Sequence, residues 1–210
     1  MIELVRYKKA YPPKLILDVP AYTIDAGIYW VRGENGAGKS TLFKSIAGLI
    51  PFDGDILIDT VSQQKKPVQY RKHVAYSEAE PLYPGFLTAK NLVRFVGEAR
   101  GISRSEQDAC CEALAITHYF ESACETYSSG MLKKTSLVLA FLGSPSVIIL
   151  DEPLVTLDTR SREALHQLIQ QKMQAIPGLT LLVSSHESMN HGFVTVDASF
   201  EIRDHSIWQA

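Results

Sequence analysis

The sequence predicts an α/β fold with a largely parallel sheet. Three observations indicate this fold: two apolar stretches with the pattern of buried strands, and one glycine-rich loop. Residues 147–150 are four consecutive branched apolar residues, which is typical of a strand buried on both faces of a parallel sheet. Residues 179–183 have a similar apolar composition and follow a segment with helical spacing. A glycine-rich stretch at 33–41 lies between a strand pattern at 28–31 and a helical pattern that Pro51 stops.

The length and composition predict one soluble α/β domain over residues 1–210. Of the 210 residues, 46% are hydrophobic and 21% are charged, which allows a sizeable core. The formal net charge of -2 argues against a nucleic-acid partner. We expect neither a membrane span nor secretion, because no apolar run reaches about 18 residues and the N-terminus lacks a leader pattern. Cys110, Cys111 and Cys124 lack zinc-site spacing and indicate ordinary thiols in a reducing cytosol.

The N-terminal part of the chain has β character. Residues 1–32 alternate apolar and polar in short runs broken by prolines and a glycine, which predicts mainly antiparallel strands and turns. Residues 53–75 continue this character, with a lysine-rich turn at 65–67 that leads to a strand at 74–76. These stretches predict an N-terminal antiparallel β subdomain.

Helical spacing dominates the middle of the chain. A helical insert is predicted over 88–126, with Thr88 and Ser103 as N-caps, inside a helical subdomain at about 80–140. A further helix is predicted at 132–142. The remaining predicted elements are a helix at 160–174 and a closing hairpin at 200–208.

The glycine-rich stretch matches the phosphate-binding pattern G-x-x-x-x-G-K-[ST] at every required position. It reads Gly33-Glu34-Asn35-Gly36-Ala37-Gly38-Lys39-Ser40-Thr41. Its glycines allow turns that a Cβ would obstruct and let the backbone approach a phosphate closely. A chance glycine-rich turn is the alternative, but the flanking strand and helix favour a nucleoside triphosphate site.

Three side chains at the end of this stretch have separate expected roles. Lys39 would place an ammonium on the β- and γ-phosphates, and the Ser40 hydroxyl would help to bind Mg²⁺. Thr41 could add a hydrogen bond to the α-phosphate.

Acidic residues at the end of the strand at 147–150 suggest the second half of the site. Ligands of doubly wound sheets lie at the carboxyl ends of the strands. There Asp151 can hold Mg²⁺ directly or through water, and Glu152 can polarise an attacking water. His186, at the end of the next strand, is placed to contact the γ-phosphate or that water. A simple acidic turn and a structural histidine are the alternatives.

With these motifs in view, the sequence resembles the ATP-binding cassette family, the nucleotide-binding subunits of ABC transporters. The resemblance runs from about Tyr11 to Trp208. The glycine loop and Leu150-Asp151-Glu152-Pro153 match the Walker A and Walker B motifs, and Leu157-Asp158 matches the end of the D-loop. Tyr127-Ser128-Ser129-Gly130-Met131 falls where the family carries its Leu-Ser-Gly-Gly-Gln signature. The resemblance implies a P-loop NTPase (RecA-like) core with an antiparallel β subdomain and a helical insert, the ABC ATPase fold.

The resemblance also implies ATP and Mg²⁺ as cofactors, bound between two ABC subunits. Ser128 and the N–H groups of Ser129 and Gly130 form a second anion site at a helix N-terminus. One ATP hardly needs two remote anion sites from one chain, whereas a head-to-tail homodimer or heterodimer uses both. A plain helix cap is the alternative. The family's switch histidine corresponds to His186, and its adenine-stacking aromatic corresponds to Tyr11, with Tyr7 as the next candidate.

Some motif positions depart from the family pattern. Tyr127, Ser129 and Met131 replace Leu, Gly and Gln of the signature. In the Q-loop, Tyr76-Ser77-Glu78-Ala79-Glu80-Pro81 has Ala79 or a neighbouring glutamate where the family has glutamine. Val155-Thr156 is an unusual filling of the D-loop. We expect these departures to affect the coupling of hydrolysis to the partner more than they affect ATP binding.

The function that the resemblance implies is an ATPase subunit that powers a separate integral membrane permease, with export preferred over import. Short single cassettes of this kind are similar to bacterial exporter subunits, including the cytochrome-c-maturation type. The expected location is cytoplasmic, on the inner face of the cell membrane through the permease. The alternatives are a catalytically weak partner in a heterodimer, a soluble cassette without a transport role, and an unrelated P-loop kinase.

The resemblance also implies a contact with the permease at Leu82-Tyr83-Pro84-Gly85-Phe86, because cassettes of this family receive the coupling helices of their partner after the Q-loop. The apolar side chains of this loop, which are costly to leave in water, favour the same expectation. The alternative is that this loop folds back onto the helical insert.

Overall fold

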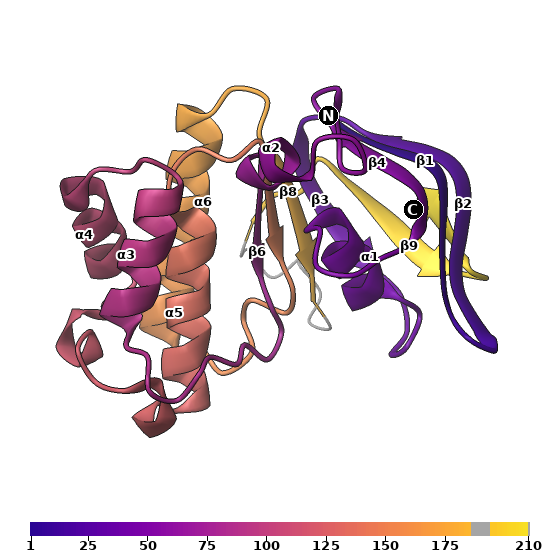
Figure 1. The fold of residues 1–210 in the computed structure, drawn as a ribbon. Coiled ribbons are helices and arrows are strands. Elements are labelled where there is room, and N and C mark those ends of the chain that lie inside the picture. The colour runs from indigo at the N-terminus through magenta and orange to yellow at the C-terminus, as the bar shows by residue number, and fades with distance from the viewer. Residues whose placement is uncertain (186–193, 210) are drawn as a thin grey trace.

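A computed structural model describes residues 1–185 and 194–209 as two sheets and a helical region (Figure 1). The larger sheet has six strands in the order β10-β9-β3-β8-β7-β6. The pairs β3–β8, β3–β9, β6–β7 and β7–β8 are parallel, and β9–β10 is an antiparallel hairpin. Its strands are β3 (Gly27–Arg32), β6 (Val74–Ser77), β7 (Val147–Leu150), β8 (Thr180–Ser184), β9 (Ala198–Arg203) and β10 (Ser206–Gln209).

The smaller sheet is antiparallel and has the order β2-β1-β4-β5. Its strands are β1 (Ile2–Tyr11), β2 (Lys14–Ile24), β4 (Asp53–Ile58) and β5 (Val61–Ser62). Helix α1 (Lys39–Ile46) lies between the two sheets (Figure 1). The α/β fold with an antiparallel β subdomain is therefore confirmed. The expectation of mainly antiparallel strands over 1–32 is wrong for 27–32, because β3 pairs with β8 and β9 in the parallel sheet.

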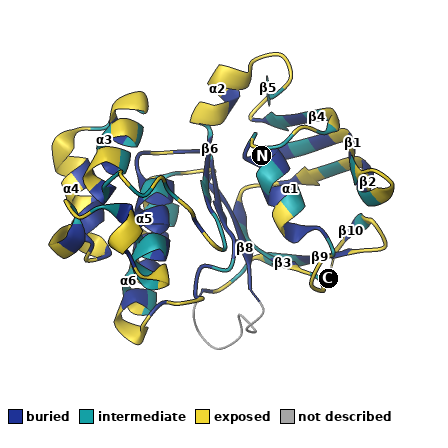
Figure 2. Cartoon of the chain, turned by 60° about the horizontal axis from the view of Figure 1, so that its bottom comes forward, coloured by how far each residue is buried: buried dark blue, intermediate teal, exposed yellow. Residues whose placement is uncertain are grey.

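The central strands are apolar throughout because a different layer covers each of their faces. In β7, Val147 and Ile149 pack into the cluster around α1, whereas Ile148 and Leu150 pack against helices α5 (Ser129–Phe141) and α6 (Thr159–Ala175). Figure 2 shows these central strands buried while the outward faces of the surrounding helices are exposed. Two-sided burial is what four consecutive apolar residues predict.

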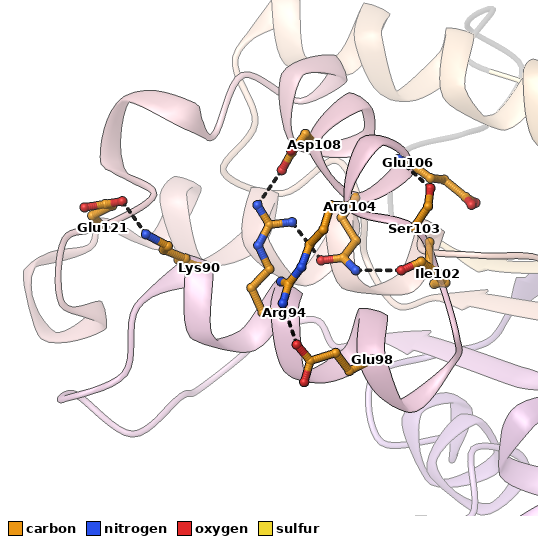
Figure 3. A network of polar contacts seen from close by, with 10 residues as sticks. Lys90, Arg94, Glu98, Ile102, Ser103, Arg104, Glu106, Asp108 and Glu121 are labelled. Atoms are coloured by element: carbon orange, nitrogen blue, oxygen red, sulfur yellow. Dashed lines mark hydrogen bonds and ion pairs between the residues drawn. The ribbon is translucent and has the colours of Figure 1, made fainter.

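The helical insert contains α3 (Ala89–Ala99), α4 (Arg104–Ala113), and the short 3₁₀ turns η1 (Thr117–Tyr119) and η2 (Cys124–Thr126). Thr88 and Ser103 cap α3 and α4 by accepting hydrogen bonds from N–H groups three residues on, as the sequence predicts. Polar contacts join the two helices (Figure 3): Arg94 donates to Gln107 at 2.8 Å and to Asp108 at 2.6 Å. The helical insert is thus held by polar contacts, which are part-buried or exposed, as well as by apolar packing.

Two local predictions need correction. The lysine-rich segment before β6 continues into a helix, α2 (Pro67–Lys72), because Pro67 starts the first turn and the buried Tyr70 hydroxyl donates to the Ile46 carbonyl at 2.8 Å. Helix α5 begins at Ser129 and not at 132, because the Ser128 hydroxyl accepts a hydrogen bond from the Met131 N–H. Within the described residues, no helix is both long and apolar enough to cross a membrane.

Candidate nucleotide site

The strand register brings the predicted motifs to one edge of the parallel sheet. Leu150 pairs with Val183 and Ser77, and Val31 pairs with Ser184. The segments that follow β3, β6, β7 and β8 therefore leave the sheet at the same level. Since these strands are parallel, this edge is their carboxyl end, where ligands of such sheets bind.

The glycine loop between β3 and α1 is shaped by close backbone contacts. Gly38 has φ 113° and stands at the N-cap of α1, and a Cβ there would lie 2.9 Å from Ile16 Cγ2. A Cβ at Gly33 would lie 2.7 Å from the carbonyl oxygen of Ile202 in β9. Only glycine fits both places. No side chain from the described part of the chain caps α1, so its first N–H groups remain available to an anion.

Lys39 points back into this loop. Its Nζ donates to the carbonyl oxygens of Gly33 at 2.7 Å and Glu34 at 3.1 Å, and the residue is 9% exposed. An ammonium has three N–H donors, and the two carbonyls use two of them. The remaining donor can reach a phosphate held by the loop.

A pocket of about 420 Å³ joins the loop to the acidic strand end. From the loop and α1 it is lined by Asn35, Gly36, Gly38, Lys39, Ser40 and Thr41. Asp151 and Glu152 after β7 line its opposite side, together with Ala79 and Glu80 after β6. Glu34 and Ala37 line a neighbouring cavity of about 490 Å³ beside the β9–β10 turn, with Asn35 and Gly36 shared between the two.

Asp151 is held in place at both carboxylate oxygens. It is 2% exposed; the Ser184 hydroxyl donates to Oδ1 at 2.6 Å and the Tyr76 hydroxyl donates to Oδ2 at 3.2 Å. The pKa of Tyr76 is raised mainly by burial and secondly by the nearby Asp151 carboxylate. The phenol therefore stays protonated and remains a donor. Ser40 and Asp151 supply hydroxyl and carboxylate oxygens to one pocket, which fits the preference of Mg²⁺ for a few protein oxygens beside substrate phosphates.

Glu152 adopts a left-handed backbone conformation with φ 47°. Such a φ is uncommon for a residue with a Cβ. The Glu152 N–H donates to the Ser184 hydroxyl at 3.0 Å, and the same hydroxyl donates to Asp151. Ser184 therefore fixes both acidic residues relative to β8.

We predict that Ser184→Ala lowers the rate of nucleotide hydrolysis by about tenfold while nucleotide affinity stays within a few-fold, because small displacements of reacting groups are costly. Steady-state turnover and equilibrium nucleotide binding check this. Thr180→Val is the matched control, since Thr180 is buried on the same strand and its hydroxyl donates to the Asp25 carbonyl, away from the pocket. Equal turnover of the two variants would contradict the role of Ser184.

The Q-loop segment is divided between two surroundings. Glu78 forms an ion pair with Lys44 at 3.4 Å, outside the pocket lining, whereas Ala79 and Glu80 line the pocket. Of the two glutamates, Glu80 is therefore the one positioned to act on a bound nucleotide. The carbonyls of Glu78 and Ala79 accept hydrogen bonds from Lys133 of α5.

The signature segment lies elsewhere on the chain. Ser128 caps α5, and Ser129 and Gly130 form its first turn. Among the described residues that line the 420 Å³ pocket, none comes from this segment. The structure thus does not bring the two predicted anion sites of one chain together.

The departures of this segment from the family pattern have structural reasons. Tyr127 is buried, and its hydroxyl accepts from the Ala89 N–H at 3.0 Å and bonds to the Tyr119 carbonyl at 3.0 Å. Met131 is partly buried and packs against the apolar cluster that also contains Tyr127. Both side chains anchor α5 to the helical insert.

The adenine-stacking candidates differ in exposure. Tyr7 is fully buried, with its hydroxyl 2.9 Å from Ser45 Oγ, which rules it out as a platform. Tyr11 ends β1 and is 49% exposed, with Lys9 Nζ 4.4 Å from the ring centroid. Tyr11 does not line the described pocket. His186 lies outside the described residues.

Three residues of the site could not be assigned from the sequence. Tyr76, Ser184 and Lys133 contact Asp151 through side-chain or backbone atoms. For Ser184, the local signal is its place at the end of an apolar strand. Tyr76 and Lys133 have no such signal, because their contacts with Asp151 depend on how the fold brings separate elements together.

This chain is similar to known proteins in sequence and in fold. A family model described as ABC transporter matches residues 20–155, more than half of the chain. The chain is 32% identical over 189 residues to the uncharacterized ABC transporter ATP-binding protein YhcH of Bacillus subtilis, covering 89% of this chain and 62% of that relative. It is 28% identical to the cytochrome c biogenesis ATP-binding export protein CcmA of Legionella pneumophila, covering 90% and 94%.

A solved structure described as the ATP-binding subunit of an ABC transporter superposes with a TM-score of 0.86 at 26% identity, over 99% of this chain and 88% of that one. Fold, motif placement, family model and relatives all agree, and the chain belongs to the ABC transporter family.

Proposed function

We propose that this chain binds ATP with Mg²⁺ and hydrolyses it to drive transport through a separate membrane permease. The observation that carries the proposal is the pocket of about 420 Å³ that Lys39, Asp151 and Glu152 line together. A loop that binds phosphates, a carboxylate for a metal and a second carboxylate beside it are the parts that phosphoryl transfer to water requires.

We propose a separate role for each residue of the site. Lys39 contacts the terminal phosphates through its third N–H. Ser40 and Asp151 would hold Mg²⁺, which would supply positive charge to neutralise the phosphate oxygens. Glu152 accepts a proton from, or orients, the attacking water. His186 is proposed to contact the γ-phosphate, and Thr41 the α-phosphate.

We further propose that ATP is bound between two cassettes. Ser128, Ser129 and Gly130 at the N-terminus of α5 would form a second anion site, and none of the three lines the pocket beside the chain's own phosphate loop. In a head-to-tail pair, this segment of one subunit completes the site of the other. Tyr11 supplies the surface on which adenine stacks.

The permease contact is proposed at a groove of about 330 Å³ between α1, β6 and the helical insert. Leu82 is 87% exposed at the rim of this groove, and Phe86 nearby in sequence is 80% exposed. Tyr83, by contrast, packs against the helical core, and burial raises its pKa to about 12. Tyr83 therefore differs from Leu82 and Phe86, because it is partly buried against the helical core while it also lines the groove.

We predict that single cysteines at positions 82 and 86 cross-link to a polytopic membrane protein, because both apolar side chains are exposed, Leu82 lines the groove and Phe86 follows in the same loop. A cysteine at Val93, which is fully buried on α3 and outside the groove lining, serves as the buried control, and one at Trp208, which is 47% exposed on β10, as the exposed control. Membranes containing the complex are treated with a short bifunctional reagent, and the products are identified by mass spectrometry. Equal yields from positions 82, 86 and 208 would contradict this docking surface.

Export is proposed as the direction, supported by the relative whose name describes an export protein. The subunit would then lie on the cytoplasmic face of the membrane through its permease. A catalytically weak partner in a heterodimer is the second candidate, favoured by alanine and glutamate at positions 79 and 80 in place of the family's glutamine. ATP turnover by the purified chain, alone and with its permease, distinguishes the two.

A further inference from the structure

Helix α5 carries a fully buried lysine that the proposed chemistry does not use. Lys133 is 1% exposed, and its Nζ donates to three backbone carbonyl oxygens: Glu78 at 2.6 Å, Ala79 at 3.0 Å and Asp151 at 2.9 Å. Three carbonyl acceptors around one nitrogen match the three N–H donors of an ammonium. All three N–H donors of the ammonium are therefore used.

The three carbonyls belong to the two segments that line the nucleotide pocket opposite the phosphate loop. Glu78 and Ala79 directly precede Glu80, and Asp151 directly precedes Glu152; Glu80 and Glu152 both line the pocket. Lys133 lies one helical turn beyond Ser128, the N-cap of α5. One ammonium thus joins the start of α5, the Q-loop segment and the acidic strand end.

Packing alone does not account for a lysine at this position. Burying an ammonium costs free energy unless its donors are satisfied, and an apolar side chain of similar volume is often as stable. The same layer is already connected by a hydrogen bond of 2.9 Å between Ser77 and Ser136. What Lys133 adds is a fixed distance between two segments that carry pocket carboxylates.

We infer that Lys133 is a positioning residue for hydrolysis: it holds Glu80 and Glu152 in register with the start of α5. The inference rests on the proposed ATPase function. Because α5 begins at the segment that is proposed to contact the ATP of the partner subunit, docking of that segment would move both carboxylates together. Lys133 itself does not line the pocket, so it affects the placement of the reacting groups and not the binding of ATP.

The test is Lys133→Met, which keeps the length and apolar stem of the side chain and removes its donors. We expect kcat to fall about tenfold or more, since misplaced reacting groups are costly, while KM for ATP stays within about threefold. Lys172→Met is the matched control: Lys172 on α6 also donates to a backbone carbonyl, that of Gly143 at 2.6 Å, but far from the pocket. Thermal unfolding of each variant measures how much of the protein is folded. A lower kcat per folded molecule can then be distinguished from a lower amount of folded protein.

A second variant keeps the inference decidable if the methionine variant does not fold. Lys133→Gln retains two N–H donors on a shorter chain, and we expect a kcat between those of wild type and Lys133→Met, with KM again little changed. Wild-type kcat per folded molecule in either variant would overturn the positioning role, as would a loss confined to KM. An inactive wild-type protein would instead refute the proposed ATPase function, so the two failures are distinguishable.

Discussion

Glu152→Gln should stop ATP hydrolysis and leave ATP-bound subunits paired. The glutamine keeps the size and hydrogen-bonding ability of the side chain but cannot accept the proton of the attacking water, and loss of a general base lowers rates by about 10²-fold or more. The change also removes one negative charge from the pocket that Glu152 lines, so ATP should bind at least as well as to the wild type. Closed pairs should then accumulate because turnover no longer separates them.

Sedimentation of the Glu152→Gln protein with and without ATP measures this pairing directly. Ser128→Arg combined with Glu152→Gln is the informative control, because a bulky cation at the N-cap of α5 should block closure in trans while each subunit still binds ATP. If ATP produces no dimer, either of this chain or with a second cassette, the shared-site proposal is wrong. Wild-type turnover in Glu152→Gln would show that Glu152 does not perform the catalytic step.

Lys39→Ala should weaken ATP binding by about 10- to 100-fold, as expected when a hydrogen bond to a charged group contributes about 1.5–3 kcal/mol. The loss has two parts. The variant lacks the donor that reaches the phosphates, and the carbonyls of Gly33 and Glu34, which Lys39 now binds, would face the phosphates without a neutralising charge.

Equilibrium binding of ATP measures this effect. Lys44→Ala is the matched control, since Lys44 lies on the same helix but forms a half-exposed ion pair with Glu78 at 3.4 Å, and exposed pairs contribute little. Similar affinities of the Lys39 and Lys44 variants would mean that the glycine loop does not bind the triphosphate.

The linear pattern of residues was sufficient for the elements of the fold that depend on local interactions. Glycines at 33, 36 and 38 predict a loop that tolerates positive φ, and all three adopt it. The apolar run at 147–150 predicts a strand covered on both faces, and the caps at Thr88 and Ser103 predict the starts of two helices. In each case the signal lies in residues within a few positions of one another.

The tertiary structure alone decided which side chains surround the motifs. Ser184 and Tyr76 hold Asp151 from two neighbouring strands, and Lys133 reaches the same strand end from α5. Tyr83 is partly buried while Leu82 and Phe86 remain exposed, although all three belong to one apolar loop. The physical reason is that a buried polar atom is satisfied by whichever partner the chain brings close, and that partner is here tens of residues away in sequence.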